Sequence, residues 1–485
     1  MEMSYDLLVI GGGAAGLTAA GLGASFGAKT LLVEEDRLGG DCTWTGCVPS
    51  KALLKSAHDA RITENGTLGN APDDGTRFAG AMRRARRIRR EIYDDADAPE
   101  HLQEFGVEVK SGHARLVASH FAEIEREAET GTPEQVEADR VVLATGGQPA
   151  PPPLDGLANV DYLTNETLFE LEERPERAAV LGGGPIGTEM AQALQRLGVQ
   201  VTVLERSGRI LGNDHPRLAG MLQERLAEEG VTYRLGASVR RVEPAEGGPR
   251  AATIHYEQDG EHRTCTVDAL LVATGRRPRT GGLGLDAAGV DYDDSGIAVD
   301  DRCRTSAGPI WAVGDVTGRY QFTHMSEHMA KVAVTNAILK VPQKIDAGRV
   351  PWVTYTDPEL AHVGQTEREL KDDGTGYETY RFPLGRLDRA VCEGRDQGEI
   401  RLYATAWRGQ ILGASVLAPR AGELIGTVAV AMKSGASLAT ISDTIFPYPT
   451  YGQGVRRAAD QWYAQKQRPW LVRSIQTVFG YDGPV

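Results

Sequence analysis

The sequence predicts an α/β protein, because one strand–turn–helix–strand unit occurs twice and a region of alternating apolar and polar residues follows it. The chain has 485 residues, too many for one hydrophobic core, so about three domains are expected. Each unit places a glycine-rich turn between an apolar strand and a helix, which is typical of a Rossmann-like domain. The later alternation is typical of antiparallel strands and is found at residues 352–359, 381–383, 400–404 and 411–417. With helices expected near residues 422–434 and 451–466, this region predicts a separate α+β domain.

The first unit runs from an apolar strand at residues 7–10 to Glu34. Its turn carries Gly11, Gly13 and Gly16, and Glu34 lies 23 positions after Gly11. Glycines permit a tight turn and a close approach to a pyrophosphate, and the N-terminus of the following helix favours anions. The carboxylate would accept a hydrogen bond from a ribose hydroxyl.

The second unit repeats this arrangement from a strand at residues 179–181. Its turn carries Gly182, Gly184 and Gly187, and Glu205 again lies 23 positions after the first glycine. Two bound dinucleotides are therefore expected. We assign FAD to the first unit and a nicotinamide nucleotide to the second.

Glu205 also bears on which nicotinamide nucleotide binds. A carboxylate here accepts from a free 2′-hydroxyl and repels a 2′-phosphate, so we favour NADH over NADPH. Arg206 and Arg209 are close in sequence and would be able to reach a phosphate, which leaves NADPH open.

Two cysteines, Cys42 and Cys47, lie in the segment GGDCTWTGCVPSK at residues 39–51, just after the first unit. This position brings the pair, with Gly40 before it, to the region where a flavin ring would lie. A thiol pair beside a flavin indicates electron transfer between a cofactor and a disulfide. A zinc site is disfavoured, because the nearest histidine, His58, lies 11 residues past Cys47 with no further cysteine near.

Three further strand ends carry candidate cofactor contacts. They are, in chain order, Thr145 with Gly146, Gly275 with Arg276, and Gly314 with Asp315. A carboxylate at Asp315 would bind a ribityl hydroxyl of FAD, although the same residue also suits a helix N-cap.

Composition excludes several classes of function. The formal net charge of −14 argues against nucleic acid as a partner. Five cysteines are too few for a secreted disulfide scaffold and fit a cytoplasmic protein. Residues 7–28 carry no charge but are rich in Gly and Ala, so no membrane span is expected.

Together, the glycine turns, the GGDCTWTGCVPSK segment, ATGRRP at residues 273–278 and the strand end at 312–315 resemble the flavoprotein disulfide reductase family. Lipoamide dehydrogenase, glutathione reductase and mercuric reductase belong to this family. The resemblance implies a homodimer with two Rossmann-like dinucleotide-binding domains, for FAD and NAD(P), and a C-terminal α+β dimerisation domain. The expected limits are 1–150 and 276–345 for the FAD-binding domain, 151–275 for the NAD(P)-binding domain and 346–485 for the dimerisation domain.

The resemblance also implies roles for single residues. Cys42 would be the interchange thiol that meets the substrate, and Cys47 the charge-transfer thiol against the flavin. Lys51 and Glu189 match an ion pair beside the flavin, where the cation favours the anionic reduced ring.

The chain departs from this pattern near its C-terminal end. Glutathione and lipoamide enzymes carry a His–Glu dyad, given by the partner subunit, that moves protons to and from substrate thiols. Tyr448 stands here for the histidine and Gln453 for the glutamate. Mercuric reductase also has a tyrosine at this place, but it ends in a vicinal cysteine pair that residues 479–485 lack.

We therefore predict an NAD(P)H-dependent flavoenzyme whose acceptor is a soft metal ion such as Hg(II). A dihydrolipoyl dehydrogenase or disulfide reductase is the alternative, and a quinone or oxidant reductase or a flavin-bound redox sensor are further ones. We interpret His324 and His328 as ordinary helix residues in preference to a metal-binding pair. We interpret the basic run at 83–90 as a solvated helix in preference to an anion or membrane site. Residues 470–479 are interpreted as dimer packing in preference to membrane contact.

Overall fold

A computed structural model describes residues 3–64, 74–126, 132–466 and 469–483. The chain divides into two compact units, the first comprising residues 1–206 and 230–345 and the second residues 207–229 and 346–485. Each unit is described by itself.

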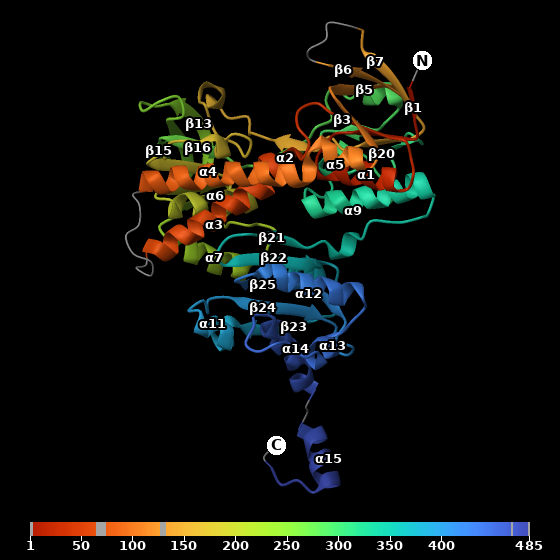
Figure 1. Ribbon diagram of the computed structural model, residues 1–485. Coiled ribbons are helices and arrows are strands. Elements are labelled where there is room, and N and C mark those ends of the chain that lie inside the picture. Colours follow the sequence, from red (N-terminus) through yellow and green to blue (C-terminus); the bar gives the residue numbers. More distant parts are fainter. Residues whose placement is uncertain (1–2, 65–73, 127–131, 467–468, 484–485) are drawn as a thin grey trace. The chain divides into compact units, whose positions relative to one another are not determined.

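The first sheet of the first unit is parallel throughout and has five strands. In order across the sheet they are β20 (Ile310–Ala312), β8 (Val141–Leu143), β2 (Leu7–Ile10), β3 (Thr30–Glu34) and β4 (Val107–Ser111). Figure 1 labels β3 and β20 of this sheet. Apart from Glu34, the side chains of β2 and β3 are buried, so both faces are covered, as a parallel sheet requires. Helix α1 (Ala14–Ser25) follows β2 and packs against α9 (Thr323–Val334).

Small residues let α1 lie close to this sheet. A Cβ added to Gly23 would lie 2.5 Å from a methyl carbon of Leu7, so only glycine fits between helix and strand. The glycine turn is therefore held at the carboxyl end of β2 by packing as well as by its own conformation.

The second sheet has the same parallel arrangement with four strands. In order they are β12 (Thr232–Leu235), β11 (Gln200–Glu205), β10 (Arg177–Leu181) and β16 (Ala269–Val272). Helix α6 (Pro185–Arg196) follows β10 and is almost wholly buried. An antiparallel sheet of β13 (Ser238–Pro244), β14 (Ala252–Gln258) and β15 (Glu261–Val267) shares its apolar core.

Helices that follow β3 carry the cysteine segment. They are α2 (Gly40–Trp44), α3 (Cys47–Glu64), α4 (Asp74–Ile92), the π-helical turn η1 (Tyr93–Asp97) and α5 (Pro99–Glu104). A small sheet of β1 (Met3–Tyr5), β7 (Glu134–Ala138), β6 (Phe121–Glu125) and β5 (His113–Ala118) completes this side. The short strands β9 (Gly147–Pro149) and β17 (Arg276–Pro278) pair with each other, which sets two of the predicted strand-end motifs side by side.

The second unit is built on an antiparallel sheet of five strands. In order they are β21 (Trp352–Thr354), β22 (Glu359–Gly364), β25 (Ile411–Ala418), β24 (Glu399–Ala404) and β23 (Glu378–Pro383). Its helices are α7 (Pro216–Glu228), α10 (Glu367–Asp372), α11 (Asp388–Cys392), α12 (Ala421–Lys433), α13 (Leu438–Asp443), α14 (Gly452–Lys466) and α15 (Pro469–Phe479). Helices α12 and α14 pack on the sheet through one apolar core.

The predicted fold class is confirmed, with one difference in detail. Residues 352–359 were expected to form one strand, but β21 ends at Thr354 and the chain turns back into β22 at Glu359. Asp357 and Pro358 lie in this turn, and both residue types favour turns over strand interiors.

None of the described helices is long and apolar enough to cross a membrane. The expected domain limits at residues 150, 275 and 345 stay a prediction.

Candidate active site

The redox helix α2 starts directly on the first glycine turn. The backbone N–H of Gly39 donates to the carbonyl of Gly12 at 2.9 Å. Gly39 and Gly40 both have positive φ, and a Cβ on Gly40 would lie 2.8 Å from the Cα of Gly13. Only glycine permits this contact, which brings the cysteine pair to the carboxyl end of the FAD-type sheet.

The two cysteines lie together as thiols on consecutive helices. Cys42 is half-buried in α2, whereas Cys47, the first residue of α3, is an exposed residue. Cys42 and Cys47 share a hydrogen bond, and the hydroxyl of Thr323 lies 3.3 Å from the Cys47 sulfur. This places Thr323, the first residue of α9, against the redox pair.

The surroundings make the two thiols unlike. The hydrogen bond from Cys42 lowers the pKa of Cys47 to about 6, and Thr323 and Lys51 act in the same direction, while loss of contact with water opposes the shift. The pKa of Cys42 is raised by its hydrogen bond to Cys47, by burial, and by the charges of Cys47 and Asp97. Cys47 is thus disposed to be the thiolate and Cys42 the thiol.

Lys51 and Glu189 meet, as the resemblance implied. Lys51 Nζ lies one turn beyond Cys47 on α3 and donates to Glu189 Oε2 at 2.9 Å. Glu189 is buried on α6, so α3 and α6 pack together around this pair. A buried carboxylate fixes the ammonium near the Cys47 sulfur.

The first glycine turn has a shape that suits a dinucleotide. Gly11 has a φ of 104°, and a Cβ on Gly16 would lie 1.7 Å from the carbonyl oxygen of Gly11. Glu34 Oε2 accepts from the N–H of Gly12 at 2.5 Å, which holds its carboxylate beside the turn. A Cβ on Gly13 would meet only Gly40, at 3.9 Å, so the backbone there is open to a ligand.

The second glycine turn repeats this geometry. Gly182 has a φ of 109°, and a Cβ on Gly187 would lie 2.0 Å from the Gly182 carbonyl oxygen. Glu205 Oε2 accepts from the N–H of Gly183 at 2.7 Å, while a Cβ built on Gly184 would meet no other part of the described chain within 4 Å. The residues of both turns therefore fit the two dinucleotides that the sequence predicted.

Arg276 links the redox helix to a second carboxylate. Its guanidinium pairs with Asp41, the residue before Cys42, lies 3.5 Å from Asp315 and donates to the Gly147 carbonyl at 3.0 Å. Burial raises the pKa of Asp315, and the charge of Arg276 opposes this rise.

The other predicted strand-end residues lie around this group. Thr145 Oγ1 donates to the Arg279 carbonyl at 2.8 Å. Gly146, Gly275 and Gly314 all have positive φ, so each turns the chain where a strand ends.

The basic run on α4 serves the redox helix rather than solvent alone. Arg89 is 7% exposed, donates to the Trp44 carbonyl at 3.1 Å and pairs with Glu170. Arg84 and Arg86 also donate to backbone carbonyls, of Ala52 and of the segment at 169–171. Exposed residues in this run include Arg83, Arg87 and Arg90.

Tyr448 is exposed in the second unit and carries a hydrogen bond to Asp388. That bond raises the pKa of the Tyr448 phenol above its ordinary value. Gln453 is buried in the first turn of α14. Neither residue offers a base near neutral pH.

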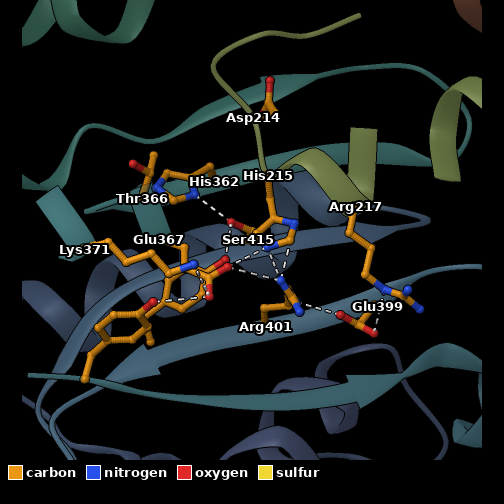
Figure 2. A network of polar contacts seen from close by, with 12 residues as sticks. Asp214, His215, Arg217, His362, Thr366, Glu367, Lys371, Glu399, Arg401 and Ser415 are labelled. Carbon is orange, nitrogen blue, oxygen red and sulfur yellow. Dashed lines mark hydrogen bonds and ion pairs between the residues drawn. The ribbon is translucent and has the colours of Figure 1, made fainter. Parts of the chain in front are cut away.

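A polar cluster in the second unit ties α7 to the sheet (Figure 2). His215, just before α7, lies 2.8 Å from Glu367 and contacts the guanidinium of Arg401. Arg401 also donates to Glu399 at 2.7 Å, and Arg217 approaches Glu399 from α7. The buried charges of this cluster are paired with one another, so we assign it the structural role of holding α7 against the sheet.

The remaining candidates from the sequence add no second centre. No group of three or more His, Cys, Asp or Glu side chains able to hold a metal occurs in the described part of the chain. The ring of His324 on α9 stacks on Phe322. The apolar face of α15 is exposed, with Trp470 and Phe479 each 65% accessible.

Thr323 and Asp97 were not predicted from the sequence. Thr323 is 276 positions from Cys47, and Asp97 accepts a hydrogen bond from Thr43 across 54 positions. The local sequence offered one indication for Thr323, its place at the start of a helix that follows the strand end at Asp315. For Asp97 the signal was an acidic residue beside a Pro-initiated helix, which is common in chains of any function.

Comparisons with protein families and known proteins agree with this geometry. The model described as pyridine nucleotide-disulphide oxidoreductase matches residues 5–330, and the model for the dimerisation domain of these proteins matches residues 350–459. A mercuric reductase from Lysinibacillus sphaericus is 33% identical over 465 residues, covering 94% of this chain and 82% of the relative. A dihydrolipoyl dehydrogenase from Thermus scotoductus is 35% identical over 468 residues, covering 95% of this chain and 98% of the relative.

Solved structures give the same result. The Cu(II) complex of the HOCl-induced flavoprotein disulfide reductase RclA from Escherichia coli matches with a TM-score of 0.84 and 27% identity, covering 95% of this chain and 100% of that one. LpdA from Mycobacterium tuberculosis matches with a TM-score of 0.85 and 27% identity, covering 95% and 99%. The chain belongs to the pyridine nucleotide-disulphide oxidoreductase family, whose members are flavoproteins that bind FAD and a pyridine nucleotide.

Proposed function

We propose that this protein passes electrons from NADH through FAD to the Cys42–Cys47 disulfide, and from there to a soft metal ion. The observation that carries the proposal is the asymmetry of the sulfur pair. Cys47 is surrounded by the Cys42 thiol, the Thr323 hydroxyl and the Lys51 ammonium, all of which favour its thiolate.

The residues of the first unit would hold FAD and direct its electrons. The first glycine turn and Glu34 would bind its pyrophosphate and ribose, and Asp315 its ribityl chain. When bound, FAD supplies the two electrons that it accepts from the nicotinamide nucleotide. Two electrons and one proton convert the disulfide into the Cys47 thiolate and the Cys42 thiol. The Thr323 hydroxyl and the Lys51–Glu189 pair then keep the negative charge on Cys47.

The C-terminal departures favour a metal ion over a disulfide as the acceptor. Exchange with a dithiol needs a base for repeated proton transfer, and Asp388 holds the Tyr448 phenol protonated, while Gln453 carries no charge. A soft metal ion binds thiolates strongly and needs only that the Cys42 proton leave. Relatives named mercuric reductase and a structural neighbour solved with Cu(II) agree with this class of acceptor.

Reduction of a dithiol or disulfide is the second candidate, because dihydrolipoyl dehydrogenases are as similar in sequence as mercuric reductases are. A quinone or oxidant reductase and a redox sensor with little turnover remain further alternatives. The match to a dimerisation domain supports a homodimer. A cytoplasmic location stays a prediction.

Titration of the purified protein with NADH tests the electron path. We expect a long-wave thiolate-to-flavin absorbance after one equivalent, and loss of Hg(II) and Cu(II) reduction in Cys42→Ser, since the interchange sulfur is gone. The same NADH-dependent assays with the disulfides lipoamide and glutathione disulfide should give little turnover. Unchanged metal-ion reduction in Cys42→Ser would contradict the path, and rapid lipoamide reduction would favour the second candidate.

The preference for NADH is a separate prediction. Arg209 donates to the carbonyls of Leu211, Gly212 and Asp214 in its own loop. Its guanidinium is therefore already engaged, whereas binding the 2′-phosphate of NADPH would need it. Glu205→Gln keeps an oxygen for the Gly183 N–H and removes the negative charge. We expect the ratio of kcat/KM for NADH to that for NADPH to fall about tenfold, because a close like-charge contact is worth on the order of 1.4 kcal/mol. A wild-type protein that prefers NADPH would refute this assignment.

A further inference from the structure

Arg276 lies between two carboxylates that come from distant parts of the chain. Its guanidinium pairs with Asp41 of the redox helix α2 and lies 3.5 Å from Asp315 in the 3₁₀ turn η4 (Gly314–Thr317). It also donates to the carbonyl of Gly147 at 3.0 Å, across the pairing of β9 with β17. The Arg276 side chain is only 14% exposed, and a buried cation needs partners of this kind.

Asp315 is held by this guanidinium and by the backbone of β9. A Cβ on Gly147 would lie 3.3 Å from Asp315 Oδ2, so the carboxylate packs directly against that strand. Burial raises the pKa of Asp315, and the charge of Arg276 opposes this rise, so the pairing favours the ionised form. Arg276 therefore acts on both the position and the charge of the carboxylate that we assign to the ribityl chain of FAD.

Asp41 carries the contact into the cysteine segment. It directly precedes Cys42, and its Oδ1 accepts a hydrogen bond from the Thr45 hydroxyl at 3.4 Å. Thr45 is the C-cap of α2 and lies two positions before Cys47. The Asp41 carboxylate thus joins the two ends of the helix that carries Cys42, and Arg276 ties this carboxylate to β17.

One cation makes both of these contacts. Within the described residues, Asp41 and Asp315 form no ion pair with any cation other than Arg276. Arg279 lies nearby, but its guanidinium is bound to Glu166 at 3.0 Å. The link between the two carboxylates therefore depends on Arg276 alone.

We propose that Arg276 is a positioning residue that holds the FAD-binding carboxylate and the redox helix in one bridge, Asp315–Arg276–Asp41. The proposal rests on the proposed role of Asp315 in binding FAD. A guanidinium presents several N–H donors in a rigid planar arrangement, so it can hold two carboxylates and a carbonyl at once, whereas an ammonium acts as a point charge. By fixing α2, the bridge keeps Cys42 close to Cys47. Two thiols held close together form a more stable disulfide, because their effective concentration is higher.

Four variants test the bridge. Asp41→Asn keeps an oxygen for the Thr45 hydroxyl but removes the charge that pairs with Arg276, so it breaks only the contact with the redox helix. Arg276→Gln breaks both contacts, and Arg276→Lys keeps the charge without the planar set of donors. Arg277→Gln is the matched control, because Arg277 is the exposed neighbour on β17. It should follow the wild type.

The stability of the disulfide reports on the redox helix. The FAD-containing proteins are equilibrated with mixtures of oxidised and reduced dithiothreitol, trapped with iodoacetamide and analysed by mass spectrometry for the Cys42–Cys47 disulfide. Asp41→Asn and Arg276→Gln should each lower the equilibrium constant for disulfide formation about tenfold, since a loosened α2 lowers the effective concentration of the thiols. Arg276→Lys should do the same. Because both residues act through one bridge, Asp41→Asn should have no added effect in the Arg276→Gln background.

The release of FAD reports on the other end of the bridge. Dissociation is followed by the rise in flavin fluorescence when the FAD-containing protein is diluted. We expect FAD to bind about tenfold more weakly to Arg276→Gln, because the carboxylate of Asp315 loses its cation. Asp41→Asn leaves the contact of Arg276 with Asp315 in place and should release FAD like the wild type.

Three results would overturn the proposal. They are an unchanged disulfide equilibrium in Arg276→Gln, additive effects of Asp41→Asn and Arg276→Gln, and a wild-type equilibrium in Arg276→Lys. Melting temperature checks the fold of each variant. If Arg276→Gln does not fold, Asp41→Asn carries the test, because Asn165 still donates to the Thr45 carbonyl at 3.3 Å in that variant.

Asp315→Asn separates this proposal from the proposed function. If Asp315→Asn retains FAD as the wild type does, the proposed role of Asp315 in binding FAD is refuted. Weaker FAD binding in Asp315→Asn but not in Arg276→Gln would instead overturn the bridge. Neither measurement uses NADH or an electron acceptor, so a missing response to NADH would refute the proposed electron path and leave this test intact.

Discussion

At the scale of single residues, the difference between the two sulfurs comes from outside the cysteine segment. The sulfur of Cys47 contacts the hydroxyl of Thr323 from α9, and the charge of Asp97 from η1 raises the pKa of Cys42. Neither helix is adjacent to the cysteines in sequence. The redox pair therefore depends on α2 and α3, which carry the cysteines, and on two elements distant in sequence, α9 and η1.

Thr323 offers a direct test of this view. Replacing Thr323 with Val removes a hydrogen-bond donor to the Cys47 thiolate, so the pKa of Cys47 should rise from about 6. A thiolate exists above its pKa, so the long-wave absorbance of the two-electron-reduced protein should appear at higher pH, by roughly one unit. Thr323→Ser keeps the hydroxyl and should titrate like the wild type. Identical titrations for Val and Ser would show that the hydroxyl does not act on Cys47.

Residues that act through local spacing were predictable from the sequence. Each acid lies beside its own glycine turn, because it ends the neighbouring strand. Glu34 accepts from the N–H of Gly12 and Glu205 from that of Gly183, while the expected bond to a ribose hydroxyl stays a prediction. Contacts across long separations were not predictable. Arg276 contacts Asp41 across 235 positions, and the sequence around either residue does not indicate its partner.

At the scale of elements, most strands and helices near the candidate site follow from apolar patterning. The helices expected at 422–434 and 451–466 are α12 (Ala421–Lys433) and α14 (Gly452–Lys466). The turn before β22 was missed because apolar residues continue on both sides of Asp357 and Pro358. The start of β22 is set by tertiary structure, because this strand pairs with both β21 and β25.

Helix α4 shows why a charge pattern alone was ambiguous. Its arginines are spread around the helix, so some must face the protein, and Arg89 caps the last carbonyl of the redox helix. Two guanidinium groups also contact the Trp44 ring, with Arg37 at 4.3 Å and Arg89 at 5.7 Å from its centroid. Such guanidinium–aromatic contacts each contribute on the order of 1 kcal/mol. The run therefore stabilises the redox segment, while its exposed members face solvent.

At the scale of the whole molecule, the chain divides in a way that the sequence did not indicate. Residues 207–229 follow the second glycine unit, yet they belong with the C-terminal unit, where His215, Glu367 and Arg401 hold them. The contacts that join this segment to the C-terminal unit are made by single polar residues about 150 or more positions apart in the sequence. No local sequence pattern therefore indicates this division of the chain. A chain with two such units should not unfold in one step, so its thermal unfolding is best followed by calorimetry.

The second unit should respond to acid through two groups of opposite sign. Burial lowers the pKa of His362 to about 4 from the ordinary 6.5, so the folded unit binds fewer protons in this window and loses stability as the pH falls. Burial raises the pKa of Asp214 to about 6 from 3.8, so the folded unit binds more protons there and gains stability as the pH falls. Trp352 contacts both, since its ring lies tilted at 4.3 Å from the ring of His362 and its indole N–H donates to Asp214 at 2.9 Å. We expect the effects to offset one another in the wild type.

Calorimetry of two variants between pH 7.5 and 4.5 separates the two effects. Asp214→Asn removes the gain, so its unfolding transition should lose up to about 3 kcal/mol as the pH falls, which corresponds to the His362 shift alone. His362→Gln keeps groups for Ser415 and the Gly364 carbonyl but does not titrate, so its unit should hold or gain stability over the same range. Each variant is compared with the wild type at pH 7.5 to separate lost packing from titration. Parallel pH profiles for the three proteins would show that neither group sets the acid response of this unit.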